Sequence, residues 1–268
     1  MCSRSEGCTA KEVPNLEPDF KQQLKGRGNR LSVVSLGSMF SMKVKLLLSV
    51  VLALAICPMA AFGEPQWELL AEEEGIKVER RDRPESPMPV FRGTGYVDVE
   101  WHNVLAFLND VENNDTWMYG CTESRILSSG ELGTFILYHR TGAPWPLWDR
   151  DVVIKTKLLK HSDGKFEVRL QSVEDERMPE QDGIVRMPRL VGSYLLKPEE
   201  NRTRIAFEID VEPGGSVPIW LVKMVSLNLP LQTLRNLRAE VVRLEKLGKY
   251  RESSERFRRH FVSQTSSH

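Results

Sequence analysis

Residues 143–153 read APWPLWDRDVV, and this stretch decides more about the fold than any other. Trp145 and Trp148 lie among prolines on a loop, and Arg150 and Asp151 then lead directly into a β-branched strand. Exposing two indole rings to water is unfavourable, because each ring carries a large apolar area. We therefore expect something to cover them, either the protein's own core or an apolar partner such as a lipid. We expect Arg150 and Asp151 to form an ion pair that ties the loop to the strand.

A second stretch, PGGSVPIW at residues 213–220, opens the last long helix. We expect Ser216 to cap the N-terminus of this helix and Pro218 to lie in its first turn. Large apolar residues then recur at steps of three and four, which is the spacing of one helical face; they are Trp220, Met224, Leu227, Leu231 and Leu234.

The segments between these two stretches predict an antiparallel sheet. Ile205, Phe207 and Ile209 share one face of a strand, while Glu208 and Asp210 share the other, as in a sheet with one dry and one wet side. We expect further strands at 76–80, 91–99, 135–138, 152–160, 166–173, 184–196 and 202–211, with a short helix or lead-in at 67–70, a loop at 83–89 and a helix at 104–108. A helix laid across the dry side of a curved sheet leaves a cavity between them. The fold class is therefore α+β.

The first 63 residues are excluded from this domain. Residues 42–63 have the three-part pattern of a secretory signal, with a basic start, an apolar run at 46–55 and small residues before the cleavage position. The run is too short to span a bilayer comfortably. We expect an exported protein and place it in the periplasm. Residues 1–41 are polar and aperiodic, and we interpret them as lying upstream of the native start.

Charge and cysteine content exclude several classes of function. The whole chain has 37 basic and 37 acidic side chains, and the part after residue 63 has 29 and 33, a net charge of about −4. Nucleic acid is therefore an unexpected partner. Cys121 alone remains of the four cysteines, so an internal disulfide and a cysteine-based metal site are excluded there. We expect a monomer without cofactor or metal, a domain at 64–250, and a solvated, polar and basic tail at 251–268.

Three motifs in this order resemble those of the START family of lipid-transfer domains. They are Trp145-Pro146 followed by Arg150-Asp151, the segment MPEQDGIVR at 178–186, and Pro213-Gly214-Gly215. The likeness runs from Trp67 to about Leu247. It implies the helix-grip fold, in which a U-shaped antiparallel sheet wraps a long C-terminal helix around a tunnel for one lipid. Members of the family generally bind and carry lipids without catalysis.

The resemblance also implies which residues form the site. The loop that holds Trp145 corresponds to a gate that contacts membranes transiently; Trp148, Gly214 and Gly215 belong to this gate. The residues implied as lipid contacts are Met118, His139, Trp145, Leu170, Met187, Phe207, Trp220, Met224 and Leu227.

The implied tunnel is more apolar than in most members. Met118, Leu170 and Phe207 stand where members often have charged or amide side chains, and His139 is the one polar residue left. Thr156 stands where sterol-carrying members have an arginine. The tunnel thus disfavours a large charged head group, but it does not choose between a sterol-like ring system and acyl chains.

Other readings of the same residues stay open. The tryptophans and the apolar lipid contacts could be ordinary core. A lipid-sensing interaction module would use the same cavity. An enzyme similar to aromatase/cyclases would take acid–base groups from Tyr138, His139 and Arg140, although the sequence has no visible nucleophile–base pair, metal-ligand spacing or phosphate loop.

Overall fold

The computed structural model describes residues 66–263. The expected signal peptide at 42–63 and the segment 1–41 lie outside the described residues, so export and the periplasm remain predictions.

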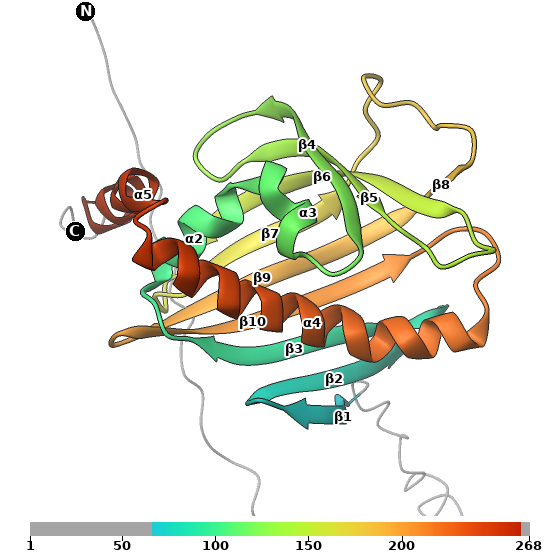
Figure 1. Ribbon diagram of the computed structural model, residues 1–268, viewed down its shortest axis with the longest axis horizontal. Helices are drawn as coiled ribbons and strands as arrows, with labels where there is room; N and C mark the ends of the chain where they lie inside the picture. Colours follow the sequence, from blue (N-terminus) through green and yellow to red (C-terminus); the bar gives the residue numbers. More distant parts are fainter. Residues whose placement is uncertain (1–65, 264–268) are drawn as a thin grey trace, which may run out of the picture. The chain divides into compact units, whose positions relative to one another are not determined.

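The described chain folds into one large sheet with helices on one side of it (Figure 1). The strand order is β1-β2-β3-β10-β9-β7-β6-β5-β4, with antiparallel pairs throughout, and β8 pairs with β6 in parallel. The elements are β1 (Glu68–Glu73), β2 (Ile76–Arg83), β3 (Ser86–Val97), α2 (Trp101–Asn109), η1 (Val111–Asn113), α3 (Asn114–Trp117), β4 (Cys121–Ser129), β5 (Phe135–Thr141), β6 (Asp149–Lys160), β7 (Phe166–Ser172), β8 (Ile184–Arg186), β9 (Arg189–Glu199), β10 (Arg202–Glu212), α4 (Ile219–Lys246) and α5 (Arg251–Ser263).

The expected alternation of the sheet is confirmed. Ile205, Phe207 and Ile209 of β10 are buried on the side that faces the helices, whereas Glu208 and Asp210 lie on the outer side. Period-two alternation therefore fixes which face of β10 joins the core, because a slip of one residue would bury the carboxylates.

Helix α4 packs mainly against one edge of the sheet, on β2 and β3. The contact is close because Gly93 of β3 has no side chain. A Cβ atom at Gly93 would lie 2.8 Å from Leu234 Cδ1 and 3.1 Å from Pro230 Cβ of the helix. The glycine thus sets the distance between α4 and this part of the sheet.

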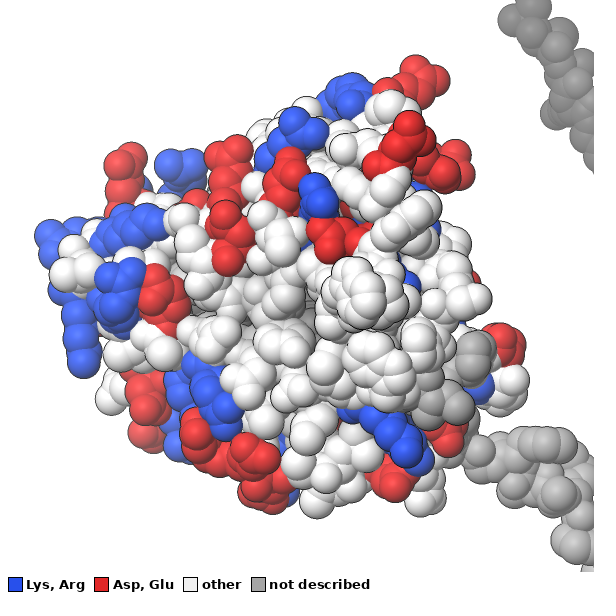
Figure 2. Space-filling model, turned by 45° about the vertical axis from the view of Figure 1, so that its right-hand side comes forward, with Lys and Arg blue, Asp and Glu red and all other residues white. Residues whose placement is uncertain are grey.

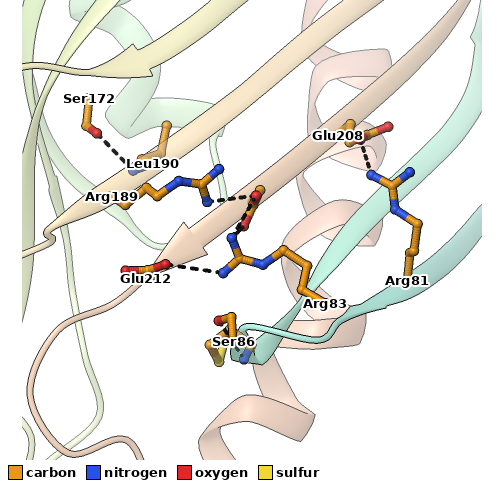
Figure 3. A network of polar contacts seen from close by, with 10 residues as sticks. Arg81, Arg83, Ser86, Ser172, Arg189, Leu190, Glu208 and Glu212 are labelled. Atoms are coloured by element: carbon orange, nitrogen blue, oxygen red, sulfur yellow. Dashed lines mark hydrogen bonds and ion pairs between the residues drawn. The ribbon is translucent and has the colours of Figure 1, made fainter. Parts of the chain in front are cut away.

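The outer side of the sheet carries an ion network close to the end of β10 (Figure 3). Arg83 contacts Asp210 at 3.1 Å and Glu212 at 3.4 Å. Arg189 contacts Asp210 at 2.7 Å. The network joins β2, β9 and β10 immediately before the Pro213-Gly214-Gly215 turn, and so fixes the base from which α4 departs.

The structure corrects several expectations at the start of the domain. The segment after Trp67 is strand β1, not a helix, because it pairs with β2 at the sheet edge. The expected loop at 83–89 is mostly the start of β3. The prolines of this segment lie before Phe91. Pairing of β3 with β10 begins only at Phe91, and the residues before it pair with β2 alone, so the missing proline N–H groups remove few hydrogen bonds from the sheet. Strand β4 and helix α3 were not expected.

The N-cap of α4 is Pro218 rather than Ser216, and no side chain caps this terminus.

The expected solvated tail after residue 250 is wrong. Residues 251–263 form helix α5, which packs against α2 and buries Phe257 and Phe261. The Ser254 hydroxyl also donates a hydrogen bond to the Asn103 side-chain oxygen at 2.6 Å. Two phenylalanines four residues apart form an apolar stripe, which the basic composition of the segment conceals. The folded domain therefore continues through α5.

Replacement of Gly93 by alanine should destabilise the protein by about 1–3 kcal/mol, because the added methyl group would force α4 away from β3. Gly130→Ala is the matched control, since its Cβ would lie no closer than 3.4 Å to any neighbour. Urea denaturation measures both free energies of unfolding. Equal values for the two variants would contradict the close packing at Gly93.

Replacement of Phe257 by alanine should cost about 3–4 kcal/mol, as expected for a phenyl ring removed from a core. The control is Val262→Ala in the same helix, whose side chain is 56% exposed and whose loss should change stability by less than about 0.5 kcal/mol. If Phe257→Ala unfolds at the same urea concentration as the parent, α5 is not docked in solution.

Candidate functional site

A cavity of about 480 Å³ lies between the sheet and the helices. Its walls come from strands β5, β6, β7, β9 and β10, and from α2, α3 and the first half of α4. These strands lie beyond the edge on which α4 is packed. The lining is mostly aliphatic and aromatic, so the cavity suits an apolar ligand.

Six of the nine expected lipid contacts line this cavity: Met118, His139, Leu170, Met187, Phe207 and Met224. Four of them lie in β5, β7, β10 and α4, and Met118 and Met187 lie in short segments beside α3 and β8. Their contact with a ligand stays a prediction, because their position in the wall is what the structure describes.

The other three are not among the lining residues, and their contact with a lipid also stays a prediction. Trp145 and Trp220 project outward, with 91% and 49% of their surface exposed. Leu227 is partly buried and packs against the main core. Helical spacing places a residue on a face, but it does not say which part of that face meets the sheet and which part meets the cavity.

His139 is buried in the cavity wall without a charged partner in the described chain. Its Nδ1 lies 3.6 Å from the Cys121 sulfur. Burial lowers the pKa of His139 to about 4 and raises the pKa of the Cys121 thiol to about 12. Both groups are therefore neutral at physiological pH, and His139 offers a hydrogen bond rather than a charge.

Thr156 also lies in the cavity wall. Its hydroxyl donates to the Gly133 carbonyl oxygen at 3.3 Å and accepts from the Phe135 backbone N–H at 3.0 Å. These bonds stay within the protein, so Thr156 closes the wall beside the β5–β6 pair.

Arg150 and Asp151 do not pair with each other, which corrects the expected ion pair. Neighbouring strand residues point to opposite faces of a sheet. Asp151 lies on the outer side and pairs with Arg186 through contacts of 2.7 and 3.1 Å. Arg150 faces the cavity and donates to the Trp148 carbonyl oxygen at 2.7 Å. It is the one lysine, arginine, aspartate or glutamate among the described lining residues, and burial lowers its pKa.

The loop before β6 is anchored at its base and exposed at its tip. Asp149 holds the base, with Arg140 at 2.7 Å and with the Ala143 backbone N–H at 3.0 Å. Trp145 and Trp148 at the tip are 91% and 63% exposed. The alternative that these two rings are core residues is therefore wrong.

The expected gate has two segments, and the Gly214–Gly215 turn is the second of them, after the Trp145 loop. Both glycines have positive φ angles, of 70° and 60°, which a residue with a side chain adopts only with strain. A Cβ atom on Gly214 would also lie 3.0 Å from the Arg186 carbonyl oxygen. The turn therefore packs closely against β8, although neither glycine is among the cavity-lining residues.

These two segments lie at the end of the domain that Figure 2 turns forward. The picture shows a largely uncharged area with acidic and basic side chains around it. Both segments contribute to the cavity wall as well, through Ala143 and Pro144 on one side and Val217 and Leu221 on the other. The same backbone thus presents tryptophans to the outside and apolar side chains to the cavity.

No helix within residues 66–263 is long and apolar enough to cross a membrane. In the same range, no three His, Cys, Asp or Glu side chains are grouped so that they could hold a metal ion.

Sequence reasoning missed several polar residues of the wall, among them Asn109, Trp117 and Tyr194. Tyr194 could have been found, because it shares the inward face of β9 with Leu190 and Leu196. Asn109 and Trp117 end two short helices, and no periodic pattern in the sequence indicates where such ends point.

Known sequences similar to this chain point to one family. The START domain profile matches residues 52–246. An uncharacterized protein of Pseudomonas aeruginosa is 32% identical over 196 residues, which cover 70% of this chain and 96% of that protein. The phosphatidylcholine transfer protein of Bos taurus is 24% identical over 173 residues, which cover 63% of this chain and 80% of that protein.

Solved structures confirm the helix-grip fold that the resemblance implied. A STAR-related lipid transfer protein from Xanthomonas axonopodis superposes with a TM-score of 0.61 and 32% identity, covering 65% of this chain and 98% of that one. Human StAR-related lipid transfer protein 5 gives 0.60 and 20% identity, covering 76% of this chain and 99% of that one. The human protein supports the fold alone, because its identity to this chain is low.

Replacement of His139 by glutamine should remove part of the protein's sensitivity to acid. Burial lowers the pKa of His139 from 6.5 to about 4, so the unfolded chain binds more protons between these values and stability falls as pH falls through them. Between pH 7 and pH 5 the parent should lose about 2 kcal/mol through this residue. Urea denaturation at the two pH values measures the loss. An equal loss in His139→Gln would show that His139 is not buried as a neutral group.

Proposed function

The chain belongs to the START domain family, and we propose that it is a non-catalytic carrier that binds a single apolar lipid in its cavity. The observation that carries the proposal is the cavity itself, which has a volume of about 480 Å³ and a mostly apolar wall and lies between the sheet and the helices. This volume is within the range of small-molecule sites. The names of the bovine and Xanthomonas relatives, both lipid transfer proteins, support the same reading.

Loading occurs between the Trp145 loop and the start of α4. These two segments close one end of the cavity with Ala143, Pro144, Val217 and Leu221. A lipid enters when the segments separate, and the Gly214–Gly215 turn supplies the backbone freedom for that motion.

The exposed tryptophans at the same end hold the open protein on a membrane. Trp145, Trp148 and Trp220 together expose three indole rings. An indole ring suits the membrane interface because its body is apolar and its N–H group needs a polar partner. Contact is transient, since the surrounding surface carries charges of both signs (Figure 2). The proposal includes a monomeric protein that works after export, as the segment 42–63 predicts.

The variant Trp145→Ala/Trp148→Ala should lower the rate of lipid transfer between vesicles about tenfold, because it removes apolar area that enters the interface. Its free energy of unfolding should change by less than about 0.5 kcal/mol, since both rings are exposed. A fluorescent lipid that is self-quenched in donor vesicles of phosphatidylcholine reports the rate.

Leu247→Ala is the matched control for this experiment. Leu247 is 68% exposed and follows the opposite end of α4 from Trp220, so its loss should leave transfer unchanged. Equal transfer by the tryptophan variant and the parent would refute the gate. A protein that binds lipid, transfers none and binds a partner protein only when loaded would be a sensor instead of a carrier.

A further inference from the structure

Several residues of the cavity wall carry buried polar atoms without hydrogen-bond partners among the described residues. In the described chain seven buried side-chain atoms have no hydrogen bond. Three belong to side chains of the outer ion network, where charged partners lie close by. Three others, namely Asn109 Oδ1, Trp117 Nε1 and the Tyr194 hydroxyl, belong to residues of the cavity wall, and the seventh is Thr233 Oγ1. Buried polar groups are nearly always paired in native proteins, so unpaired groups around one cavity indicate that its occupant supplies their partners.

The Tyr194 hydroxyl is the most firmly held of these groups. The residue is 3% exposed, on β9 in the middle of the sheet. Its ring stacks on Phe207 of β10, with the ring centres 4.6 Å apart and the planes 17° apart. Phe207 is also its cross-strand partner. The stack therefore restrains the ring, and the hydroxyl is held without a hydrogen-bond partner among the described residues.

The groups around this hydroxyl are neutral. Burial raises the pKa of Tyr194 far above its ordinary value, and the Cys121 thiol lies near enough to add to the effect. Cys121 is itself protonated and contacts the neutral His139. Among the described residues that line the cavity, the one charged side chain is Arg150, whose guanidinium bonds the Trp148 carbonyl oxygen in the loop at the mouth.

We propose that the Tyr194 hydroxyl is a specificity-determining ligand contact, which donates a hydrogen bond to a neutral oxygen of the bound lipid. This inference rests on the proposed carrier function and narrows its ligand class. The oxygen belongs to a hydroxyl group or to an ester or ketone carbonyl, on a molecule that is otherwise apolar. The described lining residues offer no carboxylate to an ammonium group, and their one cation, Arg150, bonds the Trp148 carbonyl oxygen, so a charged head group at this position is unfavourable. Phe207 stands at a position where the resemblance implied a head-group contact. Its ring stacks on that of Tyr194 in the neighbouring strand and so holds the Tyr194 side chain in place.

The proposal is tested by competition between matched lipids in Tyr194→Phe, which removes one oxygen atom and keeps the ring. The protein is incubated with phosphatidylcholine vesicles that contain equal amounts of cholesterol and cholestane, or of methyl oleate and heptadecene. Bound lipid is then extracted and quantified by mass spectrometry. The parent should prefer the oxygenated member of at least one pair, and the preference should fall about five- to tenfold in the variant. The pair that shows the effect tells whether the oxygen is a hydroxyl or a carbonyl.

Tyr250→Phe is the matched control, because the Tyr250 hydroxyl is paired with Asp110 at 2.8 Å. Its loss should lower the melting temperature of the lipid-free protein and leave the lipid preference unchanged. Tyr194→Phe should change the lipid preference without lowering the melting temperature of the lipid-free protein, since the Tyr194 hydroxyl has no hydrogen-bond partner among the described residues. Uptake with an unchanged preference in both pairs would overturn the assignment of Tyr194 alone. Absence of any uptake by the parent would overturn the carrier function, and this assignment with it.

Discussion

The close packing of α4 on β3 is the constraint on which the rest of the structure depends. At Gly93 the helix approaches the strand until no side chain fits between them. Because α4 packs mainly toward one edge, the central strands β9 and β10 have only limited contact with α2 and α4. The space that remains is the cavity. A cavity lowers the free energy of unfolding, because the side chains around it lose packing contacts. The packed core on one side of α4 therefore offsets the cost of the cavity on the other side.

The base and the tip of the loop before β6 differ in how firmly they are held, and this difference suits the proposed gate. The base is held by paired charges, with Asp149 bonded to Arg140 and Asp151 bonded to Arg186. The tip carries exposed indole rings that contribute little to the folded core. On the facing segment, the ion network of β2, β9 and β10 stops immediately before the glycine turn (Figure 3). For the proposed gate, this arrangement predicts motion at the tip, the turn and the first residues of α4, with the cavity walls fixed.

Much of the fold could be predicted from the sequence because its periodic segments are long. The alternation in β10 and the apolar face of α4 identified a sheet with a helix on its dry side. Strand β1 and helix α5 were misjudged because pairing and docking, rather than local composition, determine them. Edge pairing makes β1 a strand, and two buried phenylalanines fold a basic segment onto α2.

The site was predicted less completely than the fold. Motif resemblance pointed to residues of the apolar wall and to the exposed Trp145 loop, but it could not give the partner of a charged side chain. Arg150 and Asp151 are adjacent in sequence and yet face opposite sides of the sheet, so each has a partner elsewhere. Tyr194 carried no motif. Its importance rests on the absence of a partner for its hydroxyl among the described residues, and only coordinates give that information.

Native mass spectrometry of the protein after exposure to vesicles tests the central claim most directly. The vesicles contain phosphatidylcholine with cholesterol and diacylglycerol. The parent should retain one lipid per chain, and a variant with the cavity filled by Leu170→Trp should fold but retain none. An equal lipid load in the filled variant, or several lipids bound to each chain of the parent, would show that lipid binds elsewhere and would contradict the cavity as the binding site.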